Sequence, residues 1–489
     1  MTLFVSAPIM DVQNFKTKPY KHQLEALEKC QSSDNYGLFM EMGCGKSKVI
    51  IDNFAQLYLD EKINSVLIVA PKGVYDTWYS KEIPTHLTDE IQPHMVKWTS
   101  RETKKSKIEL DTLIWQLDKL KILVMNVEAL STKKGVNMAS AFVNNNKCMF
   151  IIDESTTIKN PKAKRTLNAI RIGKYAHYRR ILTGSPVTKS PLDLYSQCFF
   201  LDPGLLGFSS YYAFRARYAD LMESSFNGRT FKYVSNYKNL DELNESLDKF
   251  SYRVLKKDCL DLPDKIYIKR NIEMTQEQKR LYDDLKKRAM AELQEGTVTV
   301  KNVMTKIIRL HQISCGFVTT DDQEYTEIPN NRINELLEIL EEVDGKVIIW
   351  ANYRYDIRRI HRTLKEKFGG NSSVCYYGDV EQSDRETAIS EFQDPNSSVR
   401  FFVANTQTGG YGLTLTQATT VVYYSNNYDL EKRLQSEDRA HRIGQENKVT
   451  YIDIVCERTV DEKIVRALRK KQSIAKSVMG EEQWKGWLL

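Results

Sequence analysis

The chain has 489 residues and a mass of 56.7 kDa, which is too much for one ordinary core, so we expect two to four compact units. Apolar residues make up 41% of it and aromatic residues 10%, which excludes disorder along the whole chain. Lysine and arginine outnumber aspartate and glutamate by 71 to 64, and this formal charge of +7 permits a polyanionic partner without establishing one.

Two other classes of protein are excluded by patterns that the sequence lacks. No apolar stretch is long enough to cross a bilayer, and the first residues do not form a secretory signal, so we expect no membrane partner. The eight cysteines are scattered without a C-x-x-C pair, which argues against a disulfide framework and against a zinc finger.

Short apolar runs rich in β-forming residues alternate with amphipathic segments, of which Lys46–Leu59 is the clearest helix. The first set of predicted strands is 37–40, 65–70, 121–126, 148–153 and 180–183. The second set is 346–351, 373–377, 400–404, 420–424 and 449–455. Continuous apolar strands joined by helices predict parallel sheets covered on both faces, so the fold class is α/β with two parallel-sheet lobes in tandem and helical insertions between them.

The region between the two sets has helical periodicity, many charges and little strand signal. Its clearest helices are 275–295 and 303–313, and Pro263 marks the crossing between the halves because it lacks an amide donor. The predicted domains are lobe 1 over 1–203, a helical protrusion with linker over 204–262, a second helical protrusion over 263–340, and lobe 2 with a C-terminal helix over 341–489.

A glycine-rich turn follows the first predicted strand, in the sequence GLFMEMGCGKSKVI (37–50). Glycines allow backbone amides to point at phosphate oxygens, Lys46 supplies a mobile cation, and Ser47 can ligate magnesium. The full Walker pattern has a glycine where this chain has Met40, so a turn without a ligand is the alternative. The position between a strand and a helix favours the phosphate loop.

Two adjacent carboxylates end the apolar strand of MFIIDEST (149–156). Asp153 can hold the magnesium ion through water, while Glu154 can orient and deprotonate an attacking water. The alternative is the solvated start of a loop. Because the pair follows a phosphate loop within one α/β unit, it predicts the metal side of a nucleotide site.

The segment QSEDRAHRIGQ (435–445) is the third chemical element. Gln435, Arg439 and Arg442 have helical spacing, which predicts that all three lie on one helix face. A guanidinium aimed at a transferring phosphoryl group raises the rate by about 10³–10⁵. Two such arginines in the second lobe would make hydrolysis depend on lobe closure. The alternative interpretation of this segment is an exposed basic helix held by ion pairs.

The chain resembles the superfamily-two helicases, and among them the compact Swi/Snf-type double-stranded-DNA translocases without accessory chromatin domains. The resemblance extends from residue 19 to residue 445, and IKNP, LTGSP and DRAHRIGQ are its most specific parts. It rests on seven motifs that keep the family's order: PYKHQ (19–23), EMGCGKS (41–47), LIVAPKGVYDTWYSKEI (67–83), DESTTIKNP (153–161), LTGSPV (182–187), TGGYGLTL (408–415) and DRAHRIGQ (438–445).

The resemblance implies that the two lobes are RecA-like, and it implies a role for each matching residue. The implied catalytic residues are Lys46, Asp153, Glu154, Arg439 and Arg442. The implied nucleotide-binding residues are Gln23, which would read adenine, with Gly43, Cys44, Gly45, Lys46, Ser47 and Gln435. The implied magnesium ligands are Ser47 and Asp153. The implied residues for DNA contact or coupling are Lys72, Asn126, Thr183, Ser185 and Thr408.

Three positions depart from the family pattern. Thr156 stands where the family usually has histidine, Gln407 where it has arginine, and Tyr428 where it has tryptophan. These positions bear on coupling and DNA contact, and not on the phosphates or the metal. Elsewhere we expect Trp78 to pack in the core instead of stacking on a base, and His441 to be a hydrogen-bonding neighbour instead of a metal ligand.

The motifs predict an ATP- and Mg²⁺-dependent DNA-dependent ATPase that tracks along duplex DNA. We favour remodelling of forks or junctions by branch migration in replication, recombination or repair, and the alternative is a translocase that strips or remodels DNA-bound proteins. A nucleotide-regulated DNA-binding switch and an RNA-unwinding helicase are less favoured. The expected partners are double-stranded or branched DNA and replication or recombination proteins. We expect a monomer, in the cytoplasm of a bacterial or phage-infected cell or in a eukaryotic nucleus.

Overall fold

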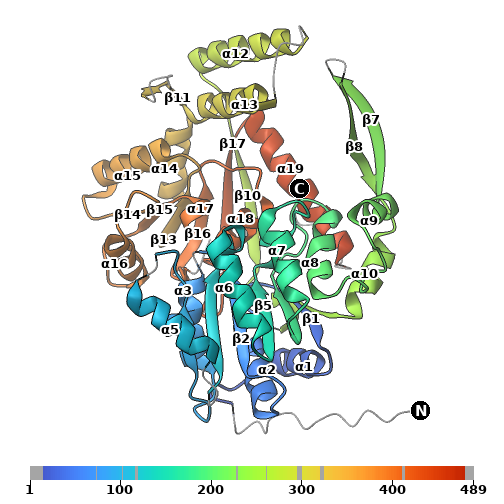
Figure 1. The fold of residues 1–489 in the computed structure, drawn as a ribbon. Helices are drawn as coiled ribbons and strands as arrows, with labels where there is room; N and C mark the ends of the chain where they lie inside the picture. The colour runs from blue at the N-terminus through green and yellow to red at the C-terminus, as the bar shows by residue number, and fades with distance from the viewer. Residues whose placement is uncertain are drawn as a thin grey trace. The chain divides into compact units, whose positions relative to one another are not determined.

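The computed structural model describes residues 15–72, 74–101, 103–115, 119–226, 229–259, 262–294, 300–319, 324–409 and 413–479. The chain forms two compact units, and Figure 1 labels their helices and strands. Unit 1 comprises Met1–Leu221, Val234–Asp261 and Ile474–Glu482, and unit 2 comprises Met222–Tyr233, Leu262–Ser473 and Gln483–Leu489. Among the described helices, none combines the length and apolar character needed to cross a membrane.

Unit 1 is built on a seven-stranded sheet with the strand order β3-β4-β2-β5-β6-β1-β9, and all of its neighbours pair in parallel. Its strands are β1 (Asn35–Met40), β2 (Ser65–Ala70), β3 (His94–Lys97), β4 (Lys121–Asn126), β5 (Cys148–Asp153), β6 (Tyr178–Leu182) and β9 (Ser251–Val254). Every residue of β2 and β5 is buried. Parallel strands covered on both sides require such continuous apolar runs.

Successive residues of β2 alternate between two hydrophobic clusters, because side chains of a strand point to opposite faces. Leu67 and Val69 belong to one cluster, and Val66 and Ile68 to the other.

The flanking helices are α1 (Lys21–Gln31), α2 (Lys46–Leu59), α3 (Tyr75–Thr77), η2 (Trp78–Glu82), α4 (Ile83–His86), α5 (Lys104–Trp115), η3 (Val127–Ser131), α6 (Lys133–Asn144), η4 (Ser155–Ile158), α7 (Lys164–Gly173), η5 (Pro191–Asp193), α8 (Leu194–Leu201), α9 (Tyr211–Tyr218), α10 (Leu240–Asp248) and α11 (Lys256–Cys259).

The segment 204–262 is not purely helical, and the prediction is wrong in this respect. After α9 the chain forms a separate two-stranded sheet of β7 (Ala219–Phe226) and β8 (Arg229–Tyr237). It then returns through α10 to β9, which joins the main sheet beside β1. The Asn-Gly pair at 227–228 is a strong hairpin signal in the sequence, but the many charges around it were read as helical.

Unit 2 contains a six-stranded parallel sheet with the order β10-β17-β16-β13-β15-β14. Its strands are β10 (Lys265–Ile272), β13 (Lys346–Trp350), β14 (Ser373–Tyr376), β15 (Phe401–Ala404), β16 (Ala418–Tyr423) and β17 (Val449–Cys456), and a small sheet pairs β11 (Phe317–Thr319) with β12 (Tyr325–Glu327). The predicted α/β class with two parallel-sheet lobes is therefore confirmed.

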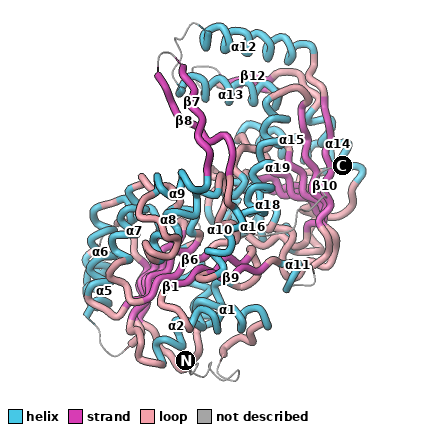
Figure 2. The backbone as a smooth tube through the Cα atoms, turned by 90° about the vertical axis from the view of Figure 1, so that its right-hand side faces the viewer, coloured by secondary structure: helices cyan, strands magenta, loops and turns pink. Residues whose placement is uncertain are grey.

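The prediction of a helical protrusion over 263–340 is wrong at its start, because β10 is an edge strand paired with β17 over eight residues. The helices of the unit are α12 (Gln276–Gln294), α13 (Val300–Cys315), α14 (Arg332–Glu342), α15 (Arg354–Phe368), α16 (Gln382–Gln393), α17 (Thr406–Gly409), α18 (Leu430–Glu437) and α19 (Val460–Val478), the last of which extends into the residues of unit 1. Both ribbon and tube views show α12 beside α13, outside the sheet of the unit (Figures 1 and 2).

Candidate functional site

The turn between β1 and α2 has the geometry of a phosphate loop. Gly43 has φ +86° and Gly45 has φ +82°, both in the left-handed region that glycine adopts without steric cost. A Cβ atom on Gly45 would also lie 2.1 Å from Nε2 of Gln23, so a side chain at this position would displace the amide of Gln23. Gly45 is the N-cap of α2, which begins at Lys46, and the loop therefore presents a helix N-terminus.

Gln23 lies against this loop from α1. Its Nε2 donates to the carbonyl of Cys44 at 3.3 Å, and its Oε1 accepts from the backbone N–H of Tyr20 at 2.9 Å. The ring of His22 reaches the same Cys44 carbonyl at 2.9 Å. These bonds fix the amide of Gln23 beside the loop, as its place in the motif predicts, while its adenine-reading role stays a prediction.

Lys46 and Asp153 meet at the carboxyl edge of the sheet. The Nζ of Lys46 donates to the carbonyl of Met40 at 2.9 Å. Burial raises the pKa of Asp153, while the hydrogen bond from Trp78 and the charge of Lys46 act in the opposite direction. The charge of Lys46 thus acts on the carboxylate at the end of β5.

The residues around Asp153 suit a magnesium ion. The site offers the carboxylate of Asp153 and the hydroxyl of Ser47, which lies in the first turn of α2. Within the described ranges, no group of three or more histidine, cysteine, aspartate or glutamate residues could hold a metal by itself. Such a sparse oxygen set fits Mg²⁺, which keeps several waters and is held by one or two carboxylates together with substrate phosphates.

Glu154 follows Asp153 in an unusual backbone conformation. Its φ of +48° and ψ of +63° lie in the left-handed region, which is uncommon for residues other than glycine and recurs at functional sites. Its N–H donates to Oδ1 of Asp153 at 2.9 Å, and its Oε2 accepts from Oγ1 of Thr183 at 3.3 Å. Because of this turn, the two adjacent carboxylates face different partners, Asp153 the indole of Trp78 and Glu154 the hydroxyl of Thr183.

The loop after β6, which contains LTGSPV, approaches the phosphate loop. A Cβ atom on Gly184 would lie 3.0 Å from the backbone nitrogen of Met42, which is closer than ordinary van der Waals contact, so the two loops approach each other tightly here. The N–H of Ser185 donates to Oγ1 of Thr183 at 3.1 Å. Arg253 of β9 donates to the carbonyls of Phe39 and Gly184, at 2.7 and 3.0 Å. The structure therefore gathers Gln23, the phosphate loop, the acid pair and this loop into one site within unit 1.

Two functional positions were not recognised in the sequence. Trp78 is fully buried, as expected of a packing residue, but its Nε1 also donates to Oδ2 of Asp153 at 2.8 Å. It begins the short π-helical turn η2, a geometry that is frequent at functional sites. The sequence did not indicate Arg253, because this residue lies in β9. A strand of only four residues gives little signal in the sequence.

The predicted DNA-facing residues of unit 1 lie at the ends of parallel strands. Lys72 is exposed just after β2, and Asn126 ends β4, where its Oδ1 accepts from the N–H of Ala129 at 2.9 Å. The carboxyl ends of parallel strands share one edge of a sheet, so these residues lie on the same edge as Asp153. Their contact with DNA stays a prediction.

The prediction that Gln435, Arg439 and Arg442 lie on one helix face is wrong. Helix α18 ends at Glu437, and both arginines lie in the turns that follow. A tertiary hydrogen bond replaces the helical one at Arg439, whose carbonyl accepts from the N–H of Leu415. The carbonyl of Glu437 still accepts from the N–H of His441 at 3.3 Å, and it also accepts from Tyr451 OH.

The two arginines nevertheless converge on one loop of unit 2. The Nη1 atoms of Arg439 and Arg442 donate to the carbonyl of Leu413, at 3.0 and 3.4 Å. Arg439 also donates from Nε to the carbonyl of Gln435 at 2.8 Å. Thr408 lies in α17, where its N–H donates to the side chain of Asn405 at 2.9 Å. The remaining glycines of TGGYGLTL, at 410 and 412, lie outside the described residues.

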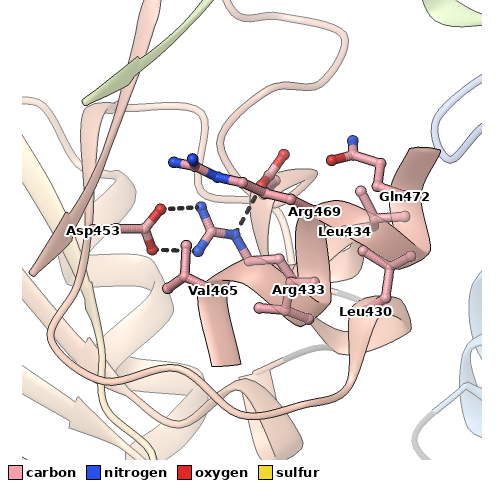
Figure 3. A pocket seen from close by; sticks show the side chains of 9 residues that line it. Leu430, Arg433, Leu434, Asp453, Val465, Arg469 and Gln472 are labelled. Atoms are coloured by element: carbon pink, nitrogen blue, oxygen red, sulfur yellow. Dashed lines mark hydrogen bonds and ion pairs between the residues drawn. The ribbon is translucent and has the colours of Figure 1, made fainter. Parts of the chain in front are cut away.

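A buried network of charges supports the helix that leads to these arginines. Arg433 of α18 donates from Nη1 and Nη2 to the carboxylate of Asp453, at 2.5 and 3.1 Å, and from Nε to Glu437 at 2.9 Å. Its guanidinium lies 3.4 Å from the ring centre of Tyr423. Figure 3 shows Arg433 and Asp453 facing each other in the lining of a small pocket beside α18. His441 follows, with Nε2 at 2.7 Å from the carbonyl of Pro263, so it acts as a hydrogen-bonding neighbour as predicted.

Comparison with known families gives two matches along the chain. Residues 21–317 match the SNF2-related domain, and residues 331–444 match the helicase conserved C-terminal domain. The chain resembles the SWI2/SNF2 ATPase core of Sulfolobus solfataricus, solved in complex with double-stranded DNA, at 22% identity and a TM-score of 0.42, over 99% of this chain and 97% of that one.

Several curated proteins are similar over most of the chain. An uncharacterized ATP-dependent helicase of Mycoplasma genitalium, MG018, is 26% identical over 90% of this chain and 40% of its own length. The putative ATP-dependent helicase/translocase YwqA of Bacillus subtilis is 26% identical over 91% of this chain and 46% of its own length. The subunit snf22 of the SWI/SNF chromatin-remodeling complex of Schizosaccharomyces pombe is 26% identical over 92% and 27%. The chain thus spans less than half the length of each of these relatives.

Proposed function

Because the chain belongs to the SNF2-related family, whose domain accounts for residues 21–317 of its 489, we propose that it is an ATP- and Mg²⁺-dependent motor that acts on duplex DNA. The observation that carries this proposal is the convergence of Lys46, Asp153, Glu154 and Thr183 at one edge of the sheet in unit 1. The bacterial and yeast relatives named as ATP-dependent helicases or remodelling subunits support it.

Each residue of the site has a distinct task in phosphoryl transfer. The amides of the phosphate loop and the ammonium of Lys46 bind the phosphates, and Glu154 orients the attacking water and accepts its proton. Thr183 holds one oxygen of the Glu154 carboxylate and so fixes the orientation of this base. When bound between Ser47 and Asp153, Mg²⁺ supplies charge neutralisation on the phosphates.

The test is ATP turnover by the full chain with duplex DNA, single-stranded DNA and RNA as separate activators. Duplex DNA should stimulate turnover most. Glu154→Gln should abolish hydrolysis while ATP still binds, because only the base is lost. Glu128→Gln, at an exposed glutamate in the same unit, is the matched control and should turn over normally. Normal hydrolysis by Glu154→Gln would refute the assignment of the site.

We also propose a task for the motor, namely remodelling of forks or junctions by branch migration in replication, recombination or repair. A motor that grips duplex phosphates has no need to part the strands of a linear duplex. At a junction, each base pair broken is offset by one re-formed, so a stacking cost of about 1.4 kcal/mol per step nearly cancels. The two bacterial relatives support a bacterial cytoplasm as its location, and we propose that it works there as a monomer.

This task is tested by strand separation on forks and four-way junctions against linear and tailed duplexes with matched arms. Separation confined to the branched substrates would support branch migration. Equal separation on all of them would favour a general helicase. Hydrolysis without branch movement, combined with displacement of a protein bound to the duplex, would favour the stripping of bound proteins instead.

A further inference from the structure

A buried glutamine in unit 1 joins two parts of the site that are far apart in sequence. Gln197 accepts at Oε1 from Oγ of Ser155 at 2.6 Å. Its Nε2 donates to the carbonyls of Pro186 and Asp193, at 2.9 and 2.8 Å. The side chains of Ser155 and Gln197 are both fully buried. The amide therefore uses its acceptor and both of its donors, and its orientation is fixed because two carbonyls can only face the NH₂ group.

The hydrogen-bonded bridge through Ser155 and Gln197 connects the turn of the proposed base to the loop after β6. Ser155 is joined by a peptide bond to Glu154, the residue that we assign as the base. Pro186 and Thr183 belong to the LTGSPV loop, and the exposed Lys189 follows two residues after its end. Gln197 lies in the middle of α8, whose sequence LYSQCFFL is otherwise mostly apolar. A buried amide in such a helix is costly unless it is fully paired.

The bridge is one of three contacts that join the same two segments. Thr183 donates to Glu154 at 3.3 Å, and Lys159 donates from Nζ to Oγ1 of Thr188 at 2.6 Å. The bridge through Gln197 lies between these two contacts along both segments. The acid turn and the loop after β6 are therefore linked at three successive points, and the middle link is the most deeply buried.

We propose that Ser155 and Gln197 are positioning residues that transmit a displacement of the LTGSPV loop to the Glu154 turn. This inference rests on the proposed function, in which DNA stimulates hydrolysis. A shift of the Pro186 carbonyl pulls on the amide of Gln197, and the amide pulls on the hydroxyl of Ser155. The peptide next to Glu154 then moves, and with it the carboxylate that orients the water. Neither side chain takes part in binding ATP.

The test uses Ser155→Ala in the full chain, which removes one buried oxygen and leaves the rest of the turn in place. We expect duplex-stimulated kcat to fall about tenfold, because the loss of one buried hydrogen bond shifts an equilibrium by roughly that factor. The basal kcat and the KM for ATP should stay within about twofold of the wild type. Gln197→Met, which has a side chain of similar length that cannot donate to the carbonyls of Pro186 and Asp193, should cause the same loss of stimulation.

The matched control is Ser196→Ala, one position before Gln197 on α8. The hydroxyl of Ser196 is also buried, but it has no hydrogen-bond partner among the described residues, so its removal should leave stimulation unchanged. Hydrogen exchange at the amides of 155–158 gives a readout apart from activity, since DNA should alter their protection in the wild type and not in Ser155→Ala.

The outcomes separate this inference from the proposed function. Wild-type stimulation by DNA that persists in Ser155→Ala would overturn the inference alone. An equal loss of basal and stimulated turnover would also overturn it, because it would indicate a purely structural role. If DNA did not stimulate the wild-type chain, the proposed function would fail, and the inference would fail with it.

Discussion

Asp356 of α15 gives the clearest prediction on stability. Its side chain is fully buried, and neither carboxylate oxygen has a hydrogen-bond partner among the described residues. Burial raises its pKa from 3.8 to about 8, although the charges of Arg332 and Arg359 act in the opposite direction and Asp461 adds to the rise. The folded unit 2 therefore keeps a proton on Asp356 that the unfolded chain has lost at neutral pH.

The magnitude follows from the two pKa values. Below about pH 4 both states are protonated and Asp356 contributes no pH dependence. Between about pH 4 and pH 8 only the unfolded state ionises, so the free energy of unfolding falls by about 1.4 kcal/mol for each pH unit. Above about pH 8 both states are ionised and the slope ends. The whole window corresponds to about 5 kcal/mol.

The perturbation is Asp356→Asn, which keeps the shape of the side chain and cannot ionise. We expect its free energy of unfolding to lose this slope, so the variant gains stability relative to the wild type as the pH rises from 5 to 8. The assay is urea unfolding of the full chain across this range, with hydrogen exchange of β13 and α15 reporting on unit 2. Asp284→Asn, at an exposed position of α12, should keep the wild-type slope. If Asp356→Asn kept it as well, the reasoning would be refuted.

Three further predictions concern the nucleotide site. Arg439→Ala and Arg442→Ala should each lower kcat by about 10³-fold with little change in ATP binding, and a loss confined to binding would contradict a role in the transition state. Trp78→Phe should weaken Mg²⁺ binding in the presence of ADP by about 10–100-fold by titration, because Asp153 loses its donor. Trp350→Phe is its control, since the buried indole N–H of Trp350 has no partner among the described residues. The sulfur atoms of Cys44 and Cys259 lie 3.7 Å apart, so diamide, which takes two protons and two electrons from the pair, should form a disulfide that reversibly lowers ATP binding. Cys259→Ser should be insensitive to diamide, whereas Cys375→Ser should respond like the wild type.

The sequence predicted the central strands and the edge strand β14, but it did not predict the edge strands β3, β9 and β10. Buried central strands such as β2 and β5 are continuous apolar runs, which are visible without any knowledge of their neighbours. The edge strand β10 alternates half-buried and exposed residues and contains three charges, so its sequence KIYIKRNI resembles that of the charged helices around it. Edge strands depend on a partner that is distant in sequence, and for β10 this partner is β17.

The candidate site was likewise predictable where the local sequence determines its geometry, and it was not predictable where distant residues do. The phosphate loop and the acid pair were predictable because local chemistry dictates them, with glycines at positive φ and carboxylates at a strand end. The helical spacing of Arg439 and Arg442 was misleading because α18 ends at Glu437 and the carbonyl of Arg439 pairs with the distant Leu415. The family resemblance is confirmed by the match of the SNF2-related domain, but it could not reveal the hydrogen bond from Trp78, which depends on packing between two distant segments.

The departure from the family pattern at Thr156 lies beside the buried hydrogen bond between Ser155 and Gln197. Thr156 stands where the family usually has a histidine, and its side chain is buried, within the turn that follows the acid pair. The neighbouring Ser155 makes the contact that reaches the loop after β6, through Gln197. A link through the middle of an apolar helix requires a serine and a glutamine together, since either one alone would leave a buried polar group unpaired. The connection from Ser155 through Gln197 to the loop after β6 therefore does not involve the side chain at position 156.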